Sequence, residues 1–102
     1  LKLSGRSGFD HHFDFGFSAT SRRPESVMQA VNSLSRDLAT SVAFAVNDVR
    51  LQRGTDAIQA YTIVNDRDVK PSLDYIDALK AYGITVHTWN EREALVPVFG
   101  RN

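Results

Sequence analysis

The chain has 102 residues, of which 42% are hydrophobic and 24% charged, so it suits one globular domain and excludes a disordered chain. Its formal net charge is zero, which gives no support to a membrane surface, an acidic partner or a nucleic acid bound through a basic surplus, although local basic patches leave nucleic acid open as a partner. The sequence has no cysteine, which excludes disulfides, thiolate metal sites and cysteine nucleophiles.

Alternating phenylalanines predict the first strand. Phe13, Phe15 and Phe17 are separated by polar or small residues, and this period of two is typical of a half-buried strand. After a glycine- and serine-containing loop over residues 1–8, we therefore expect a strand over residues 9–17 whose phenylalanines face the core.

The same strand carries the candidate metal ligands. Asp10, His12 and Asp14 alternate and should share one face, where two carboxylates and an imidazole could hold a divalent ion. A strand face of this composition is more often solvated, so no bound metal is predicted and the three residues stay candidates only. His11 should point to the opposite face, near the phenylalanines.

A helix is predicted over residues 24–33. Pro24 suits the first position of a helix, and apolar residues follow at helical spacing. These residues are Val27, Met28, Val31 and Leu34. Arg22 and Arg23 precede the amino end, which attracts anions, so they are candidate phosphate-binding residues, although such arginines are usually solvated.

Two short apolar runs over residues 41–46 and 57–64 predict strands buried on both faces. The link between them, residues 49–55, is shorter than the roughly dozen residues that a parallel crossover needs. We therefore expect these two strands to be antiparallel.

A second helix begins at Pro71 and ends before Gly83, where a left-handed residue commonly closes a helix. Residues 84–89 predict a fourth strand, and a capping-box pattern predicts a short helix over residues 91–96. The predicted order is strand, helix, strand, strand, helix, strand, helix. The fold class is α/β, on the border with α+β, with a four-stranded mixed sheet flanked by helices.

Asp48 and Asp66 each follow a predicted strand, where a carboxylate often binds a metal or ligand. If the two strands are antiparallel, these ends lie roughly 20 Å apart and cannot share one ion. Two turn or cap residues are then the plainer interpretation, because Asp side chains bond nearby backbone.

A metal-dependent nuclease is the enzymatic alternative. A restriction-enzyme-like site would combine Asp48 with the Asp68-x-Lys70 motif, but this motif falls in a loop before Pro71. The carboxylates would have to converge to bind Mg²⁺ or Mn²⁺. A PIN-like site, suggested by Asp66 and Asp68 before a helix, would need further acids on neighbouring strands, which the sequence does not offer.

The remaining candidate binding residues are Trp89 and Arg92, near the start of the last predicted helix. A tryptophan there can stack on a base or a partner side chain, although it more often covers the edge of the core. The sequence contains no glycine-rich phosphate loop and no Gly-x-Ser-x-Gly elbow, so it does not predict a nucleotide site or a serine nucleophile.

No apolar run approaches the roughly 20 residues of a membrane-spanning helix, and no signal peptide is visible. Together with the absence of cysteine, this predicts a cytoplasmic domain without a membrane partner. Because the sequence begins at Leu1 instead of methionine, we expect residues 1–102 to form a single domain, the C-terminal part of a longer two-module protein.

Five segments together resemble a known family. The segments are SGFDHHFDF (7–15), FAVND (44–48), VND (64–66), YGI (82–84) and TWNERE (88–93). As a set they are similar to the domain of unknown function 1829, which occurs in bacteria and phages and commonly follows the domain of unknown function 1828. The resemblance implies that this companion is the missing upstream module, and it implies no activity and no catalytic residue.

We therefore expect a non-catalytic interaction module, without a cofactor, that docks the upstream module or self-associates. The alternative is a nuclease or an inactive relic, which would use Mg²⁺ or Mn²⁺ with Asp48, Asp66 and Asp68.

Overall fold

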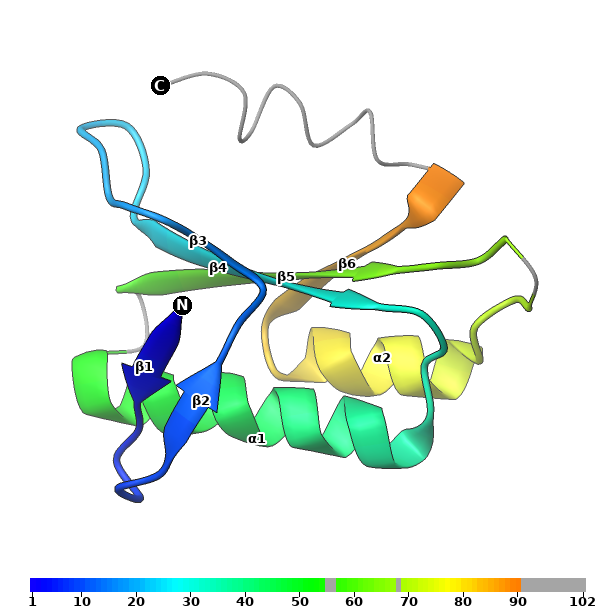
Figure 1. The fold of residues 1–102 in the computed structure, drawn as a ribbon, viewed down its shortest axis with the longest axis horizontal. Coiled ribbons are helices and arrows are strands. Elements are labelled where there is room, and N and C mark those ends of the chain that lie inside the picture. Colours follow the sequence, from blue (N-terminus) through cyan, green and yellow to red (C-terminus); the bar gives the residue numbers. More distant parts are fainter. Residues whose placement is uncertain (55–56, 68, 91–102) are drawn as a thin grey trace.

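The computed structural model describes residues 1–54, 57–67 and 69–90, which form two helices and six strands (Figure 1). The strands are β1 (Lys2–Ser4), β2 (Asp10–His12), β3 (Phe15–Phe17), β4 (Glu25–Val31), β5 (Ile58–Val64) and β6 (Ile84–Thr88). The helices are α1 (Arg36–Arg53), between β4 and β5, and α2 (Leu73–Ala81), between β5 and β6. Neither helix of this described part is long and apolar enough to cross a membrane.

The strands form two sheets. β1 and β2 make a small antiparallel hairpin, and the other four strands make a sheet in the order β3-β4-β5-β6. In this larger sheet β3 is antiparallel to β4, whereas β4, β5 and β6 are parallel. The predicted fold class, with a four-stranded mixed sheet in a mixed helix-and-strand domain, is therefore confirmed and falls on the α+β side.

The two faces of the four-stranded sheet are covered differently. Both helices lie on one face of the four-stranded sheet, and the β1–β2 hairpin lies on the same side, beside α1 (Figure 1). No helix of the described ranges covers the opposite face, which we call the open face. On the open face Phe15 and Ala30 are exposed, whereas Ser26 and Met28 of β4 are buried although no described helix covers them.

The core lies between the sheet and the helices. Val27 pairs with Ala60, and Ala60 pairs with Ile84, so these three buried side chains form one row across the helix-facing side of the sheet. They belong to one cluster with buried residues of both helices. Leu3 and Phe13 join this cluster from the hairpin, so the hairpin completes the core next to α1.

The helix predicted over residues 24–33 is wrong, because these residues contain β4. Ser26, Val27 and Met28 are consecutive and all buried, so both faces of the strand are covered. A strand buried on both faces has a nearly continuous apolar run, which does not show the period of two and can imitate the spacing of a helix.

The strand predicted over residues 41–46 is also wrong, because these residues lie inside α1. The hydroxyl of Ser35 caps this helix by accepting a hydrogen bond from the N–H of Leu38 at 3.1 Å, and Gly54 ends it with a φ of 105°. Its buried apolar residues recur at helical spacing. They are Ala39, Val42, Ala43, Val46 and Val49.

This helix also removes the basis of the predicted antiparallel link over residues 49–55. Residues 49–54 of this link are the last part of α1 and its cap, and α1 itself is the crossover between the parallel strands β4 and β5. The sheet is mixed because of β3, at the other side of β4, and not because of a reversal between the two strands that were predicted to be antiparallel.

The second half of the chain agrees better with the prediction. β5, α2 and β6 occupy the predicted segments, and Gly83 has a φ of 70° just after α2. The predicted helix over residues 91–96 lies outside the described residues. The predicted single strand over residues 9–17 is instead two strands, β2 and β3, which belong to different sheets.

Candidate functional site

The carboxylate of Asp48 joins three hydrogen bonds that connect the N-terminal hairpin to α1. Asp48 is buried on α1, yet both of its carboxylate oxygens are occupied by the loop between β1 and β2 and by β2 itself. The N–H of Ser7 donates to Oδ1 at 2.8 Å, and the hydroxyl of Ser7 donates to Oδ2 at 2.6 Å. Nε2 of His11 lies 2.7 Å from the same Oδ2. Three hydrogen bonds therefore join the hairpin to the helix at one side chain.

The backbone of the hairpin loop follows the helix closely at this point. The N–H of Arg6 donates to the main-chain oxygen of Asp48 at 3.0 Å. A Cβ atom on Gly5 would lie 1.9 Å from Oδ2 of Asp48, so only glycine fits where the loop crosses the carboxylate. The hairpin is therefore held against Asp48 by its main chain as well as by the side chains of Ser7 and His11.

The environment favours the ionised form of Asp48. The hydrogen bond from the Ser7 hydroxyl is the largest cause that lowers the pKa of Asp48, and burial opposes it by raising the pKa. The bond from His11 and the bond from the Ser7 N–H lower the pKa further. Because an ionised carboxylate only accepts hydrogen bonds, an N–H at Nε2 of His11 donates the hydrogen bond to Asp48.

A serine, a histidine and an aspartate meet here, but not as a catalytic triad. In such a triad the histidine lies between the two others and takes the serine proton. Here Ser7 and His11 both bond the same oxygen of Asp48, and the Ser7 hydroxyl also accepts from the N–H of Phe9 at 3.2 Å. The arrangement holds the hairpin against α1 and does not activate the serine as a nucleophile.

Aromatic contacts extend this joint. The rings of His11 and Phe44 meet edge to face with centroids 5.5 Å apart, and those of Phe9 and Phe44 do so at 6.3 Å. Phe9 and Phe44 keep large exposed surfaces, so this part of the joint is at the molecular surface. The segments 7–15 and 44–48, which carried much of the sequence resemblance, therefore contact each other directly.

Asp66 lies far from Asp48. Asp66 follows β5, where its Oδ2 accepts a hydrogen bond from the side-chain amide of Asn90 at 3.0 Å. Asp48 lies near the other end of β5, because Arg50, two positions further along α1, bonds the main-chain oxygen of Ile58 at 3.3 Å. The seven residues of β5 span roughly 20 Å, so the two carboxylates belong to opposite ends of the sheet. The predicted separation is present, although Asp48 is helical.

Of the other two residues of the nuclease hypothesis, Lys70 alone lies in the described part of the chain. Lys70 is exposed in the segment before α2, and Asp68 lies outside the described residues. Within the described ranges, no group of three or more His, Cys, Asp or Glu residues is arranged to hold a metal ion.

The candidate ligands of the first predicted strand separate from one another. Asp10 and His12 are in β2, where Asp10 accepts a hydrogen bond from the hydroxyl of Ser4 at 2.6 Å, whereas Asp14 lies beyond the end of β2. The carboxylate of Asp14 accepts a hydrogen bond from the N–H of Ala30 at 2.7 Å, so it binds the main chain of β4. The expected shared face does not form, because one strand became two.

The candidate anion-binding arginines precede a strand and not a helix. Arg22 and Arg23 lie in the connection between β3 and β4, so the helix amino end on which their prediction depended is absent there. Arg22 is exposed, and its N–H donates to the hydroxyl of Thr20 at 3.2 Å. Arg92, the fourth candidate binding residue with Trp89, lies outside the described residues.

Trp89 lies on the open face, at the edge where the parallel strands end. It lines a shallow pocket of about 270 Å³ together with Phe15, Met28 and Ile63, and the side chains of Phe15 and Trp89 are 54% and 41% exposed. Phe15 was expected in the core, which is wrong. The register explains the error, because Phe15 pairs with Met28, whose neighbour Val27 faces the helices.

The sequence analysis also did not identify Ser7 and His11 as functional candidates, although it singled out their partner Asp48. Both lie in a short segment whose role depends on contact with a helix far away in the sequence. The available signal was the occurrence of the segments 7–15 and 44–48 in the same set of family-like motifs.

These features define an α+β domain with a mixed sheet, helices on one face only and an N-terminal hairpin bonded to the longer helix. The chain belongs to the family described as domain of unknown function DUF1829, whose model matches residues 5–92 and so includes both contacting segments. The resemblance seen in the sequence is thereby confirmed. No curated protein and no solved structure matches the chain.

Proposed function

We propose that this chain is a non-catalytic interaction module that associates with a second copy of itself through the open face of the sheet. The observation that carries the proposal is the exposure of two aromatic side chains on that face, Phe15 at 54% and Trp89 at 41%. Large aromatic side chains dominate the binding energy of protein interfaces, and a contiguous exposed apolar patch commonly marks one.

The chemistry of the open face favours self-association. In register, the strand residues that point away from the helices are apolar, hydroxyl-bearing, amide-bearing or imidazole side chains, with no Asp, Glu, Lys or Arg among them. They are Phe15, Phe17, Ser26, Met28, Ala30, Gln59, Tyr61, Ile63, Thr85 and His87, of which Ser26 and Met28 are buried. In a two-fold symmetric dimer each patch meets its own copy, so uncharged strand residues limit electrostatic repulsion to that of Arg67, which lines the pocket with Phe15 and Trp89.

The acidic residues give the nuclease alternative little support. Asp48 is occupied by Ser7 and His11, and Asp66 is roughly 20 Å away along β5. Two carboxylates at this separation cannot bind one Mg²⁺ or Mn²⁺ ion, which takes oxygen ligands within a few Å. A module that binds through its sheet needs no such convergence.

The test is the oligomeric state of the full chain in solution. Sedimentation velocity across a dilution series should give a dimer that dissociates as it is diluted. Phe15→Ser should shift the chain to the monomer, whereas Leu51→Ser, which removes a side chain of α1 with a similar exposure of 56%, should leave the dimer intact.

Circular dichroism provides the control that both variants stay folded. A wild-type chain that is monomeric at every concentration would overturn the proposal. Equal dissociation of the Phe15 and Leu51 variants would also overturn it, because the open face would then have no special part in the association. A dimer that resists Phe15→Ser would point away from the open face as the interface.

A further inference from the structure

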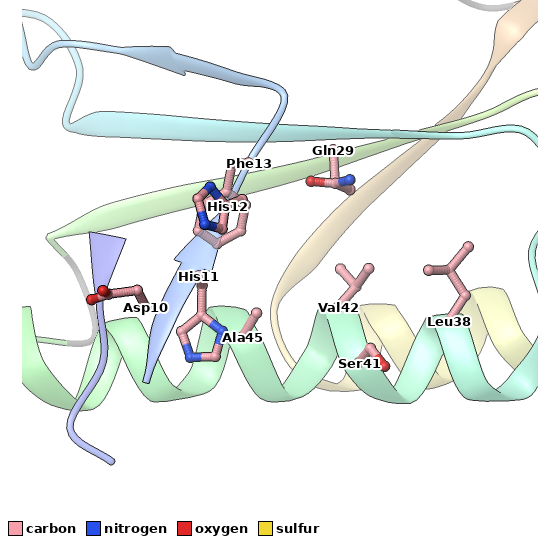
Figure 2. A pocket seen from close by; sticks show the side chains of 9 residues that line it. All are labelled: Asp10, His11, His12, Phe13, Gln29, Leu38, Ser41, Val42 and Ala45. Carbon is pink, nitrogen blue, oxygen red and sulfur yellow. The ribbon is translucent and has the colours of Figure 1, made fainter. Parts of the chain in front are cut away.

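A groove runs between β2 and the first half of α1, on the helix side of the sheet. It encloses about 250 Å³ and takes its lining from β2 with the adjoining Phe13, from β4 and from α1 (Figure 2). The lining residues are Asp10, His11, His12, Phe13, Gln29, Leu38, Ser41, Val42 and Ala45. In Figure 2 the side chains of α1 lie below, Gln29 of β4 lies above, and β2 stands at one end with β1 on its far side.

The edge of β2 at this groove has main-chain groups that none of the six described strands uses. Leu1 and Phe13 exchange two hydrogen bonds, with N–O distances of 3.1 and 2.8 Å, so they form a bonded pair of the antiparallel ladder. Because such pairs recur every second residue, Leu3 and His11 form the next one. The N–H and C=O groups of Asp10 and His12 therefore point away from β1.

No strand of the described part of the chain pairs with that outer edge of β2. An unpaired edge offers donors and acceptors at the spacing of another strand, and binding of an extended peptide to such an edge is a recurring mode of recognition. The hairpin itself is held rigidly, since Ser7 and His11 bond Asp48 of α1. The edge is therefore presented in a fixed position above the helix.

The side chains of the groove suit the side chains of such a strand. Leu38, Val42 and Ala45 form an apolar floor along α1. Gln29 occupies a helix-facing position between Val27 and Val31, where a core residue would be apolar, and its side chain forms no hydrogen bond with another described residue. An amide above an apolar floor fits an occupant that brings both apolar side chains and main-chain polar groups.

Size and charge narrow the class of occupant. About 250 Å³ is below the roughly 300–1,000 Å³ of sites for drug-sized ligands, but it can hold one or two side chains of an extended peptide. Asp10 is the single carboxylate in the lining, and the lining contains no Lys or Arg. Lys2 already pairs with Asp10, with 3.8 Å between Nζ and Oδ2, and the lining offers an acidic segment no further cation, so the occupant should be neutral or basic.

We infer that this groove binds an extended, neutral or basic peptide segment of another protein, which adds as a strand to the free edge of β2 with alternate apolar side chains on the floor of α1. This activity goes beyond the proposed self-association and uses a different surface. Its failure would leave the open face untouched, because none of the groove residues belongs to that face.

Selection of random peptides displayed on phage against the full chain tests the inference. Enriched peptides should lack Asp and Glu and alternate in hydrophobicity, and each is then synthesised and its affinity measured by fluorescence anisotropy. Ser41→Arg, which fills the groove, should weaken binding by about tenfold or more. The matched variant Asn47→Arg adds the same side chain at an exposed position of α1 outside the groove lining and should leave the affinity unchanged.

Two further measurements distinguish strand addition from other binding in the groove. Methylation of alternate main-chain nitrogens of the peptide should abolish binding in one of the two alternating patterns only, because a strand uses every second N–H. The amide protons of Asp10 and His12 should exchange more slowly when the peptide is bound. Failure to enrich any peptide, or peptides whose affinity is the same for Ser41→Arg and the wild type, would overturn the inference.

Discussion

His11 and Asp48 are 37 positions apart in the sequence, and Nε2 of His11 lies 2.7 Å from Oδ2 of Asp48. This bond, the two from Ser7 and the main-chain bond from Arg6 to Asp48 connect the N-terminal hairpin to α1. The apolar contacts of Leu3 and Phe13 with the core complete that connection. The groove that we assign to peptide binding depends on it, because the hairpin positions one wall of the groove.

Replacement of Asp48 by asparagine should lower the thermal stability of the chain by several degrees. The neutral amide cannot accept from the Ser7 hydroxyl, the Ser7 N–H and His11 with equal strength, and hydrogen bonds to an ionised group are the stronger kind. The melting temperature, followed by circular dichroism, measures the loss. Asn47→Ala, at the exposed neighbouring position, provides the control and should have little effect.

Acid should weaken the same connection. The folded chain holds the pKa of Asp48 below its usual value, so the resulting stability is present above the pKa of the unfolded chain, about 3.9, and is lost as the pH falls through the lower folded value. Urea unfolding measured between neutral pH and pH 2 should therefore show a steeper loss for the wild type than for Asp48→Asn. Parallel curves for the two proteins would contradict this assignment.

Gly5→Ala should destabilise the chain more than Gly8→Ala. A Cβ atom at Gly5 would lie 1.9 Å from Oδ2 of Asp48, so the loop or the helix has to move, at a cost of about 3 kcal/mol. At Gly8 a Cβ atom meets nothing within 4 Å, and only the φ of +92° opposes it, at about 1 kcal/mol. Urea unfolding of both variants measures the difference. An equal loss would show that the loop does not crowd the carboxylate.

An element was predicted correctly from the sequence where several features of its residues indicated the same structure. At α2 and β6 the helical spacing, Gly83 and the following apolar run all indicated the same boundaries. At β4 and α1 the apolar residues were dense and the period was ambiguous. Helix and strand were therefore exchanged in both segments, and Ser35 was not predicted as the cap that begins α1.

The candidate site was harder to predict from the sequence than the fold was. Asp48 was identified from its place after an apolar run, but its partners Ser7 and His11 meet it only because the hairpin folds back onto α1. A contact over 37 positions leaves no local pattern in one sequence. The exposure of Phe15 also depended on a register that no local pattern encodes, because β2 ends at His12 and β3, which begins at Phe15, belongs to a different sheet.

The two helix caps should differ in their contribution to stability. Ser35 caps α1 with a side-chain hydrogen bond, whereas Ser72 occupies the same position of α2 without one. Ser35→Ala should therefore cost about 1 kcal/mol of unfolding free energy, and Ser72→Ala should cost clearly less. Chemical denaturation of the two variants under the same conditions provides the comparison. A larger loss for Ser72→Ala would show that the cap of α1 is not the bond between Ser35 and Leu38.

Metal binding separates the interaction module from the nuclease alternative. Because Asp48 is occupied by Ser7 and His11 and lies roughly 20 Å along the sheet from Asp66, titration with millimolar Mg²⁺ or Mn²⁺ should produce no binding heat in a calorimeter. The melting temperature should be the same with and without these ions, since a ligand that binds only the folded chain would raise it. Heat that disappears in both Asp48→Asn and Asp66→Asn would instead reveal one shared ion. The hairpin would then have to leave α1, and the module would have to be reassigned as a metal-dependent enzyme.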